Sequence, residues 1–325
     1  MTATNPERAK GPAQHAAARR SRTTVRARLT ALTGALCLAL ALAAPLAAAD
    51  GGGRELDILL TNDDGFEAPG IRALQAALSA AGHRVTMVAP RENQSGASWR
   101  ISTGPVRYRE EAPGVWAVDG SPADAVAVGL QVIVGDRRPD LVVSGANFGH
   151  NVGATANVSG TVGAALMAEY LGVPAIAVSV GMDLAEKAAT PAPFPSTTAA
   201  LPAAAEFTAQ LVGDIAASAG NGPLLPADAV LNVNYPVAPA AAPRGVRLAE
   251  NGRYSAFTYD YVQTGADNEV RLAFTSDEAA AREAGTDTAL FAQGYVTITV
   301  LDADLAAPDG AEQTVAQRLR SFLAR

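Results

Sequence analysis

The sequence predicts an α/β protein with a Rossmann-like, doubly wound and mostly parallel sheet, and three observations lead to this class. Between residues 56 and 236, short apolar runs of strand length alternate with segments whose apolar residues have helical spacing. Loops rich in Gly, Asn, Asp and Pro separate these segments, as turns do. The chain has 325 residues, of which 49% are hydrophobic, so it can bury one large core. Such alternation is typical of parallel strands joined by right-handed helical crossovers.

The first half of this core is expected to contain strand–helix–strand units. Residues 56–61 form an apolar run that ends at the turn-like sequence Asn-Asp-Asp-Gly, which is typical of a buried strand. Apolar residues recur at helical spacing ahead of Gly82, a helix stop signal. The elements expected here are strands over 56–61 and 85–89, a helix over 70–81, β-like runs near 100–108 and 115–118, and a helix from about 120 to about 134.

The second half continues the alternation and then becomes more β-like. We expect strands over 141–144, 173–180 and 229–236, the last of them closing the main sheet, and helices over 160–171, 199–219 and near 312–323. Residues 183–204 are rich in Ala and Pro and are interpreted as a loop or linker. The predicted organisation is a core of about 56–236 followed by a β-rich C-terminal arm, about 244–325, that could make oligomer contacts.

Residues 1–49 have the pattern of a secretory signal peptide. Seven basic residues and one acidic residue precede or flank an apolar run that ends in small residues. We expect cleavage between Ala49 and Asp50, which leaves a mature domain over 50–325 that is periplasmic or secreted and has no membrane span. An uncleaved membrane anchor is the alternative, against which Pro45 and the small-residue end argue. The pair at Arg19 and Arg20 leaves a twin-arginine export route open.

Cysteine, histidine and net charge exclude several classes of protein. The one cysteine, Cys37, excludes a disulfide framework and a Cys-rich zinc module. The histidines, His15, His83 and His150, are too scattered to predict a His-built zinc site, so a metal would be a hard ion held by oxygens. The net charge is −7; without residues 1–49, the 25 basic and 32 acidic residues become 18 and 31, a net charge of −13. This acidity argues against general coating of nucleic acid.

Polar residues follow three of the predicted strands. Strand by strand they are Asp63 and Asp64; Asn93, Ser95 and Gly96; and Ser144, Gly145 and Asn147. The carboxyl ends of parallel strands meet at one edge of a sheet, where ligands bind. Two adjacent carboxylates repel each other unless a cation compensates them, and oxygen donors suit Mg²⁺ or Mn²⁺. Each motif alone is as well explained by a turn or a loop, but their convergence predicts a metal site whose candidate ligands are Asp63, Asp64, Ser95 and Asn147.

A second feature suggests phosphate chemistry. Ser159, Gly160 and Thr161 stand at the expected positive N-terminus of a helix, where free backbone N–H groups bind anions. An ordinary Ser/Thr helix cap is the alternative explanation. His150, in a loop near this site, could protonate a leaving group or be an exposed loop histidine, whereas His83 is expected to be structural.

Several stretches share a recognisable pattern: ILLTNDDGFEAPGI at 58–71, VAPRENQSGAS at 88–98, GSPADAV at 120–126, PDLVVSGANFGHNVG at 139–153, SGTVGAALMAEYLGVPAIAVS at 159–179, NVN at 232–234, GTD at 285–287 and GYVTITVL at 294–301. Together they resemble the SurE family of metal-dependent 5′/3′-nucleotidases. The resemblance implies an α/β/α sandwich, one divalent ion per subunit at the four candidate ligands, and a C-terminal region exchanged between subunits of dimers or tetramers. The substrate- or phosphate-binding residues expected here are Asn93, Gly96, Gly145, Asn151, Ser159, Gly160 and Thr161.

The function expected from this resemblance is hydrolysis of nucleoside 5′-monophosphates, with 3′-monophosphates left open, by an exported enzyme. We expect direct attack by a metal-activated water, with Asp63 or Asp64 as the catalytic carboxylate that positions it or accepts its proton. Gln94 stands where family members often have Arg, and Val158 where they often have Tyr, which leaves substrate preference and rate open.

Three other functions are alternatives to this one. A haloacid-dehalogenase-type phosphatase needs a nucleophilic Asp where Asn62 stands, so it fails at its central residue. An exported broad-specificity acid phosphatase of the same fold stays open. So does an exported anion- or nucleotide-binding protein without catalysis, although two adjacent carboxylates help such a receptor only if they hold a metal.

Overall fold

The computed structural model describes residues 54–237, 242–276, 283–304 and 310–323, so the predicted signal over 1–49 lies outside the described residues. The strands are β1 (Asp57–Thr61), β2 (Arg84–Pro90), β3 (Tyr108–Ala112), β4 (Val115–Val118), β5 (Leu141–Phe148), β6 (Ala175–Val180), β7 (Val230–Tyr235), β8 (Val246–Ala249), β9 (Phe257–Gln263), β10 (Val270–Ser276) and β11 (Val296–Leu301). The helices are α1 (Pro69–Ala80), α2 (Pro122–Val128), α3 (Gly160–Tyr170), α4 (Pro195–Ala219), α5 (Asp287–Ala292) and α6 (Ala311–Leu323). Short helical turns cover Gly129–Ile133, Gly153–Val158 and Leu184–Ala188.

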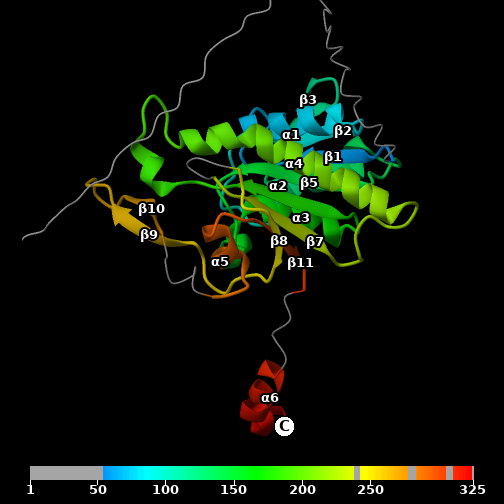
Figure 1. Cartoon of the computed structure of the whole chain (residues 1–325). Coiled ribbons are helices and arrows are strands. Elements are labelled where there is room, and N and C mark those ends of the chain that lie inside the picture. The colour runs from blue at the N-terminus through cyan, green and yellow to red at the C-terminus, as the bar shows by residue number, and fades with distance from the viewer. Residues whose placement is uncertain (1–53, 238–241, 277–282, 305–309, 324–325) are drawn as a thin grey trace, which may run out of the picture. The chain divides into compact units, whose positions relative to one another are not determined.

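A nine-stranded sheet with the order β3-β4-β2-β1-β5-β6-β7-β11-β8 organises the described residues (Figure 1). The six strands from β4 to β7 in this order run parallel, while β3 and β11 are antiparallel to their neighbours β4 and β7. Within the described residues, the chain enters the middle of the sheet at β1, continues outward to β2 and later returns to β5 on the other side of β1. This arrangement confirms the predicted doubly wound, mostly parallel class.

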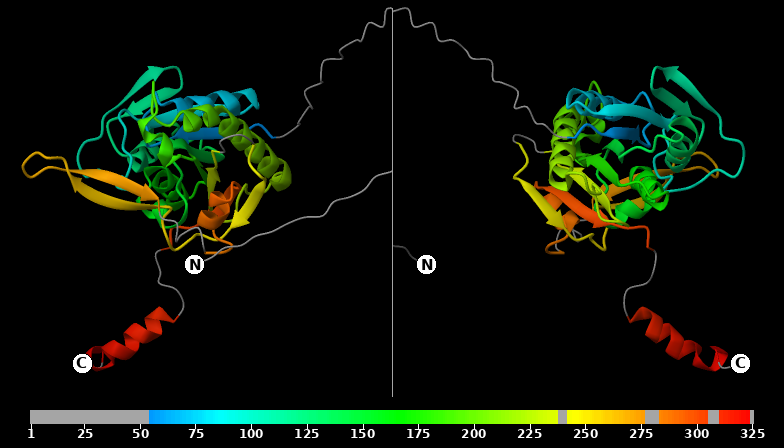
Figure 2. Two further views of the ribbon diagram at one scale, coloured as in Figure 1. Left: turned by 60° about the vertical axis from the view of Figure 1, so that its left-hand side comes forward. Right: turned by 90° about the vertical axis from the view of Figure 1, so that its right-hand side faces the viewer.

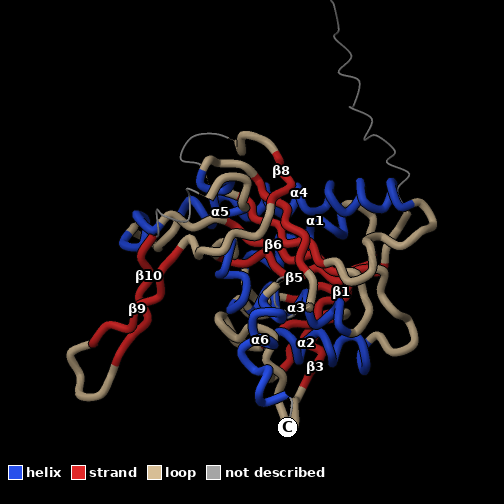
Figure 3. Tube along the Cα trace, turned by 90° about the horizontal axis from the view of Figure 1, so that it is seen from below, coloured by secondary structure: helices blue, strands red, loops and turns tan. Residues whose placement is uncertain are grey.

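Helices cover both faces of the sheet, as Figure 3 shows with the strands lying between them. Successive side chains of a strand point to opposite faces, and β1 illustrates the result. Leu60 packs in the core beneath α1 and α4, whereas Leu59 packs in the core beneath α2 and α3. Because both faces are buried, the central strands are apolar throughout rather than alternating.

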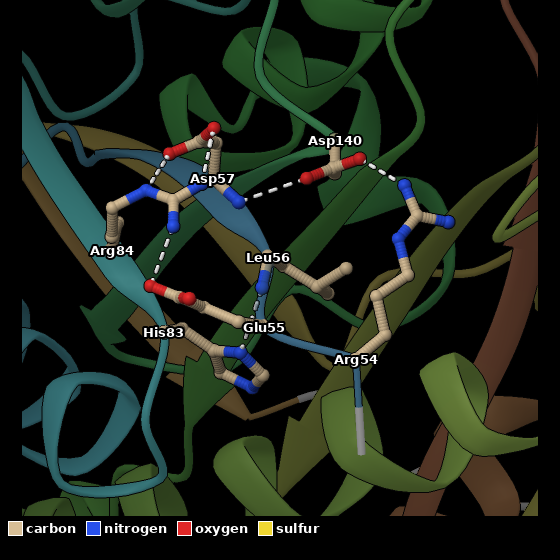
Figure 4. Close-up of polar contacts among 7 residues, drawn as sticks. All are labelled: Arg54, Glu55, Leu56, Asp57, His83, Arg84 and Asp140. Carbon is tan, nitrogen blue, oxygen red and sulfur yellow. Dashed lines mark hydrogen bonds and ion pairs between the residues drawn. The ribbon is translucent and has the colours of Figure 1, made fainter.

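Polar contacts hold the beginning of β1 at the amino edge of the sheet (Figure 4). Arg84 donates two hydrogen bonds to Asp57, from Nε to Oδ1 (2.6 Å) and from Nη2 to Oδ2 (2.8 Å). The N–H of Asp57 donates to Asp140 Oδ2 at 2.9 Å, and the N–H of Leu56 donates to His83 Nδ1 at 3.3 Å. Exposed ion pairs add little stability, but these contacts tie β1 to β2 and to the entry of β5. His83 is therefore structural, as expected.

Two sequence predictions in the core are wrong. Helix α4 begins at Pro195, inside the stretch interpreted as a linker, and contains Pro202. Pro195 occupies the first turn, where a missing N–H costs nothing, and Pro202 is exposed, so the helix continues through it. Residues 101–107 form no strand; the edge strand β3 starts at Tyr108 and pairs antiparallel with β4.

The C-terminal region does more than form an arm. Strand β7 does not close the main sheet, because β11 pairs antiparallel with it and β8 pairs with β11. The local sequence pattern does not predict this arrangement, because the pairing of β11 with β7 joins residues more than sixty positions apart. Strands β9 and β10 form a separate antiparallel hairpin that extends away from the sheet (Figure 2). None of the helices within the described ranges is long and apolar enough to cross a membrane.

Candidate active site

The turn that follows β1 presents the two adjacent carboxylates. Asn62 holds this turn: its Nδ2 donates to the carbonyl of Gly65 at 2.9 Å, and its Oδ1 accepts from the N–H of Gly65 at 3.2 Å. Asn62 is fully buried. Its amide is thus engaged on both sides, which gives a structural reason why this position supports the turn and offers no nucleophile.

The side chain of Asp63 is hydrogen-bonded to the N-terminus of α3. Its side chain, only 2% exposed, accepts from Thr161 Oγ1 (2.7 Å, to Oδ1) and from the N–H of Thr161 (3.1 Å, to Oδ2). Gly160 is required for this approach, because a Cβ there would lie 2.8 Å from Asp63 Oδ2. The prediction that these N–H groups are free for a phosphate is wrong for Thr161. The anion that the helix N-terminus holds is the carboxylate of Asp63.

Asp64 is held by the two neighbouring strand ends. Its Oδ2 accepts from the N–H of Phe148, at the end of β5, at 2.9 Å, and its Oδ1 accepts from Asn93 Nδ2, after β2, at 3.3 Å. Asn93 Oδ1 in turn accepts from the N–H of Ser95 at 2.9 Å. Asn93 therefore positions both Asp64 and the loop that carries Ser95.

The electrostatics of this pair are unfavourable without a cation. Burial raises the pKa of Asp63, and the negative charge of Asp64 raises it further, against the lowering effect of the hydrogen bonds from Thr161. Burial also raises the pKa of Asp64, opposed by its bonds to Phe148 and Asn93. Two neighbouring carboxylates that both resist ionisation are what a bound cation would relieve.

Asn147 reaches the site because β5 is irregular before its end. The pairing of β5 with β6 shifts between Ser144 and Asn147, and Gly145 packs so closely on β6 that a Cβ would lie 2.3 Å from the carbonyl oxygen of Val178. Asn147 Nδ2 donates to the carbonyl of Gly149 at 2.6 Å, which orients the amide and leaves Oδ1 as the atom suited to a cation. Gly145 therefore shapes the strand behind the site and does not line the cavity.

Part of this site opens onto a cavity of about 330 Å³, which Asp64, Asn93, Gly160 and Thr161 do not line. Of the predicted residues, those that line it are Asp63, Ser95, Gly96, Asn147, Asn151 and Ser159. The remaining wall contains His150 and Val158, together with residues that the sequence did not suggest: Phe148, Gly149, Thr155, Met182, Phe257, Tyr259, Leu272 and Phe274. The last four of these residues come from the β9–β10 hairpin, where the alternating aromatic residues were the available signal.

Asn151 lines the cavity and belongs to a network of buried amides. Its N–H donates to Asn234 Oδ1 at 2.7 Å and its Nδ2 donates to Ser179 Oγ at 2.9 Å, while its carbonyl accepts from Asn232 Nδ2 at 2.8 Å. Both of its donor groups are thus engaged with β6 and β7. The network fixes the loop between Asn147 and Asn151 against the sheet.

His150 is a buried residue rather than an exposed loop histidine. Its ring packs against the rings of Phe257 and Phe291, with centroid distances of 4.4 and 4.5 Å and tilts of 37° and 35°. Nδ1 accepts from the N–H of Met182 at 3.3 Å, so the proton of the neutral ring lies on Nε2. Burial lowers the pKa of His150 to about 3, which makes it neutral during any reaction near pH 7 and unsuited to supply a proton as an imidazolium.

A pH dependence of stability follows from this burial. Between pH 6.5 and 3 the unfolded chain binds a proton at His150 and the folded chain does not, so protonation favours unfolding as the pH falls. Relative to a His150→Phe variant, we expect the free energy of unfolding to fall by up to about 3 kcal/mol from pH 6.5 to pH 4. Urea denaturation at several pH values measures it. A parallel His83→Asn series should show a smaller dependence, and equal slopes for wild type and His150→Phe would contradict the assignment.

The fold and the site together define a Rossmann-like α/β protein with an acidic, oxygen-donor site at the carboxyl edge of its parallel strands. Residues 58–257 match the family model described as Survival protein SurE. A protein named 5′-nucleotidase SurE 1 from Burkholderia lata is 35% identical over 247 residues, which cover 75% of this chain and 89% of that protein. A 5′-nucleotidase SurE from Anaeromyxobacter dehalogenans is 43% identical over 197 residues, 60% of this chain and 68% of that one.

A solved structure gives the same result. The crystal structure of the SurE protein from Aquifex aeolicus aligns with a TM-score of 0.64 at 30% identity, over 83% of this chain and all of that one. The chain belongs to the SurE family.

Proposed function

We propose that the protein is a metal-dependent phosphomonoesterase that hydrolyses nucleoside 5′-monophosphates to nucleoside and phosphate. The observation that carries the proposal is the adjacent carboxylates at the end of β1: Asp63 is buried and lines a cavity of about 330 Å³, and Asp64 beside it is half-buried. A cavity of this size suits a nucleotide-sized ligand. The relatives named 5′-nucleotidase support the choice of substrate. Hydrolysis of 3′-monophosphates would use the same site.

The donor set fits one hard divalent ion, Mg²⁺ or Mn²⁺. The candidate ligands are Asp63, Asp64, Ser95 and Asn147, which offer two carboxylates, a hydroxyl and an amide oxygen. Among the described residues no group of three or more His, Cys, Asp or Glu side chains could hold a metal. Such an ion supplies Lewis-acid polarisation and a bound water of lowered pKa.

The protein's own residues supply position and charge. Thr161 holds Asp63 in one orientation, and Asn93 with the N–H of Phe148 holds Asp64, so neither carboxylate must reorganise during the reaction. Asp63 or Asp64 positions the attacking water or accepts its proton. Ser159 Oγ accepts from the N–H of Val162 at 3.1 Å, which leaves its own proton free to donate to a phosphoryl oxygen in the cavity.

Metal removal tests this function. We expect purified protein to hydrolyse AMP with added Mn²⁺ or Mg²⁺, to lose activity in EDTA and to regain it when the ion is restored, because Lewis-acid activation of water has no substitute in the site. Phosphate release measures it. Full activity after complete metal removal would contradict the metal-dependent proposal. Equal kcat/KM for AMP and 4-nitrophenyl phosphate would indicate a broad phosphatase, and binding of AMP without turnover a receptor.

We further propose that the enzyme is exported and that it forms a homo-dimer or tetramer. The charge and apolar pattern of residues 1–49 supports cleavage at Ala49–Asp50. Support for assembly comes from the exposed apolar side chains of the β9–β10 hairpin, such as Tyr261 (72% exposed) and Val270 (48%). N-terminal sequencing of the protein from culture fractions and light scattering of the purified protein check the two proposals.

A further inference from the structure

The lining of the cavity supplies no positive side chain for a phosphoryl group. The described residues that line it include no Lys or Arg, and the buried ring of His150 is neutral near pH 7. The charge of a divalent ion would be offset by Asp63 and Asp64, whereas a phosphate monoester brings a further charge of about −1.5 to −2 at pH 7. Arginine is the side chain whose donors best match the oxygens of such a group. A substrate in this site therefore needs a cation from a residue beside the cavity.

We propose that Arg100 is this cation. Its guanidinium is hydrogen-bonded to Gln94 in this structure, and it turns to the phosphoryl oxygens when a phosphomonoester binds. Arg100 belongs to the loop that follows Ser95 and Gly96, both of which line the cavity. The inference rests on the proposed phosphomonoesterase function, and it adds a phosphate-binding residue to that site.

Backbone hydrogen bonds fix the loop of Arg100 against two parts of the site. The N–H of Gln94 donates to the carbonyl of Asp63 at 2.7 Å, so the partner of Arg100 is attached to the acidic turn itself. The N–H of Ser98 donates to the carbonyl of Val158, which lines the cavity, at 3.3 Å. Arg100 is therefore carried by a loop that contacts both the acidic turn and the cavity wall.

The far end of the loop is anchored to the start of α2. The carbonyl of Arg100 accepts a hydrogen bond from Ser121 Oγ. Ser102 donates to Asp124 twice, from its N–H at 2.9 Å and from its Oγ at 2.6 Å. None of these contacts uses the Arg100 guanidinium. A substitution that shortens this side chain should therefore leave the loop, and the residues it positions, in place.

The guanidinium of Arg100 is available for a ligand. Arg100 is exposed, and within the described ranges its guanidinium makes one hydrogen bond, from Nη2 to Gln94 Oε1 at 3.1 Å. A guanidinium has five N–H donors, and an exposed bond to an uncharged amide is readily exchanged for one to an anion. Arg91, which precedes the same loop, is engaged in ion pairs with Glu111 (2.9 Å) and Asp119 (2.8 Å). Arg100 is thus the better placed of the two arginines to bind a phosphate.

The experiment replaces Arg100 and uses inorganic phosphate as the probe. Loss of a charge-assisted hydrogen bond lowers affinity by about 10- to 100-fold. In Arg100→Gln we therefore expect calorimetry to show phosphate binding weakened by at least about tenfold in protein supplied with Mn²⁺. We expect kcat/KM for AMP to fall by about 10- to 100-fold. Arg100→Lys should recover part of both losses, because it keeps the charge but lacks the planar pair of donors.

Arg107→Gln is the matched control, because Arg107 is an exposed arginine of the same connection that lies outside the cavity. It should bind phosphate and hydrolyse AMP as the wild type does. In Arg100→Gln the melting temperature and the affinity for Mn²⁺, followed by electron paramagnetic resonance, should stay at the wild-type values. These two readouts separate a contact with phosphate from a distorted loop, since distortion would also move Ser95 and weaken the binding of Mn²⁺.

Three results would overturn the inference: wild-type phosphate affinity in Arg100→Gln, an equal loss in Arg107→Gln, or a loss of Mn²⁺ affinity as large as the loss of phosphate affinity. Failure of the proposed function looks different, because wild-type protein supplied with Mn²⁺ would then not hydrolyse AMP. Calorimetry with phosphate still tests Arg100 in that case. A wild-type protein that does not bind phosphate contradicts the assignment of Arg100 as well.

Discussion

Replacement of Asp63 by Asn lowers kcat/KM for AMP by about 10²–10⁴-fold. The substitution removes one of the two charges that would hold a divalent ion and a candidate proton acceptor, while it keeps the shape of the side chain. An amide oxygen at this position can still accept from Thr161 Oγ1, as Asp63 Oδ1 does at 2.7 Å, whereas an amide nitrogen cannot accept from the N–H of Thr161 as Oδ2 does at 3.1 Å. The melting temperature of the variant therefore has to be compared with its activity. Steady-state phosphate release with excess Mn²⁺ measures that activity.

Two controls separate catalysis from folding. Asp214→Asn changes an exposed carboxylate on α4, outside the cavity, and should leave kcat/KM unchanged. In EDTA, Asp63→Asn should melt at or above the wild-type temperature, because burial and the charge of Asp64 disfavour ionised Asp63. An Asp63→Asn protein with wild-type turnover would show that the reactive site lies elsewhere.

Gly70→Ala should destabilise the protein by about 3 kcal/mol. Gly70 lies in the first turn of α1, where an added Cβ would meet the carbonyl oxygen of Ala146 at 1.9 Å. That oxygen belongs to the backbone of β5, so no side chain can rotate aside. The helix and the strand must separate, and Asn147, the next residue, moves with the strand. We expect a large fall in the urea concentration at the unfolding midpoint. We also expect that a higher Mn²⁺ concentration is needed for half-maximal activity.

Gly213→Ala is the matched control for this substitution. Gly213 lies inside α4, and a Cβ there would meet nothing within 4 Å. Alanine should stabilise this helix by about 0.5–1 kcal/mol, since it restricts the unfolded chain and favours the helix. A Gly70→Ala protein that melts with the wild type would contradict the close packing of α1 on β5.

The positions of the candidate ligands could be predicted because they depend on a local rule. Each follows an apolar run, and parallel strands bring such positions to one edge of the sheet. Asp63, Ser95 and Asn147 accordingly share a cavity, and Asp64 is bonded to residues from both neighbouring strand ends. The hydrogen bonds from Thr161 to Asp63 join residues 98 positions apart, so no local sequence pattern could have indicated them.

Features that depend on long-range pairing could not be predicted. Strand β11 lies between β7 and β8 and runs antiparallel to β7, which an alternating strand–helix pattern does not predict. The cavity residues Phe257, Tyr259, Leu272 and Phe274 belong to a hairpin outside the parallel sheet, so a rule based on the ends of parallel strands could not indicate them. His150 is fixed in its buried state by Phe257 and Phe291, which lie more than one hundred residues further along the chain. Its burial, which decides its protonation, is a tertiary property.

If Asp63, Asp64, Ser95 and Asn147 form one cation site, as we propose, a Mn²⁺ titration followed by electron paramagnetic resonance will detect it. We predict one bound Mn²⁺ per chain in the wild type and in Asp214→Asn, and loss of this binding in Asp63→Asn. Binding of Mn²⁺ to Asp63→Asn with the stoichiometry and affinity of the wild type would contradict the claim.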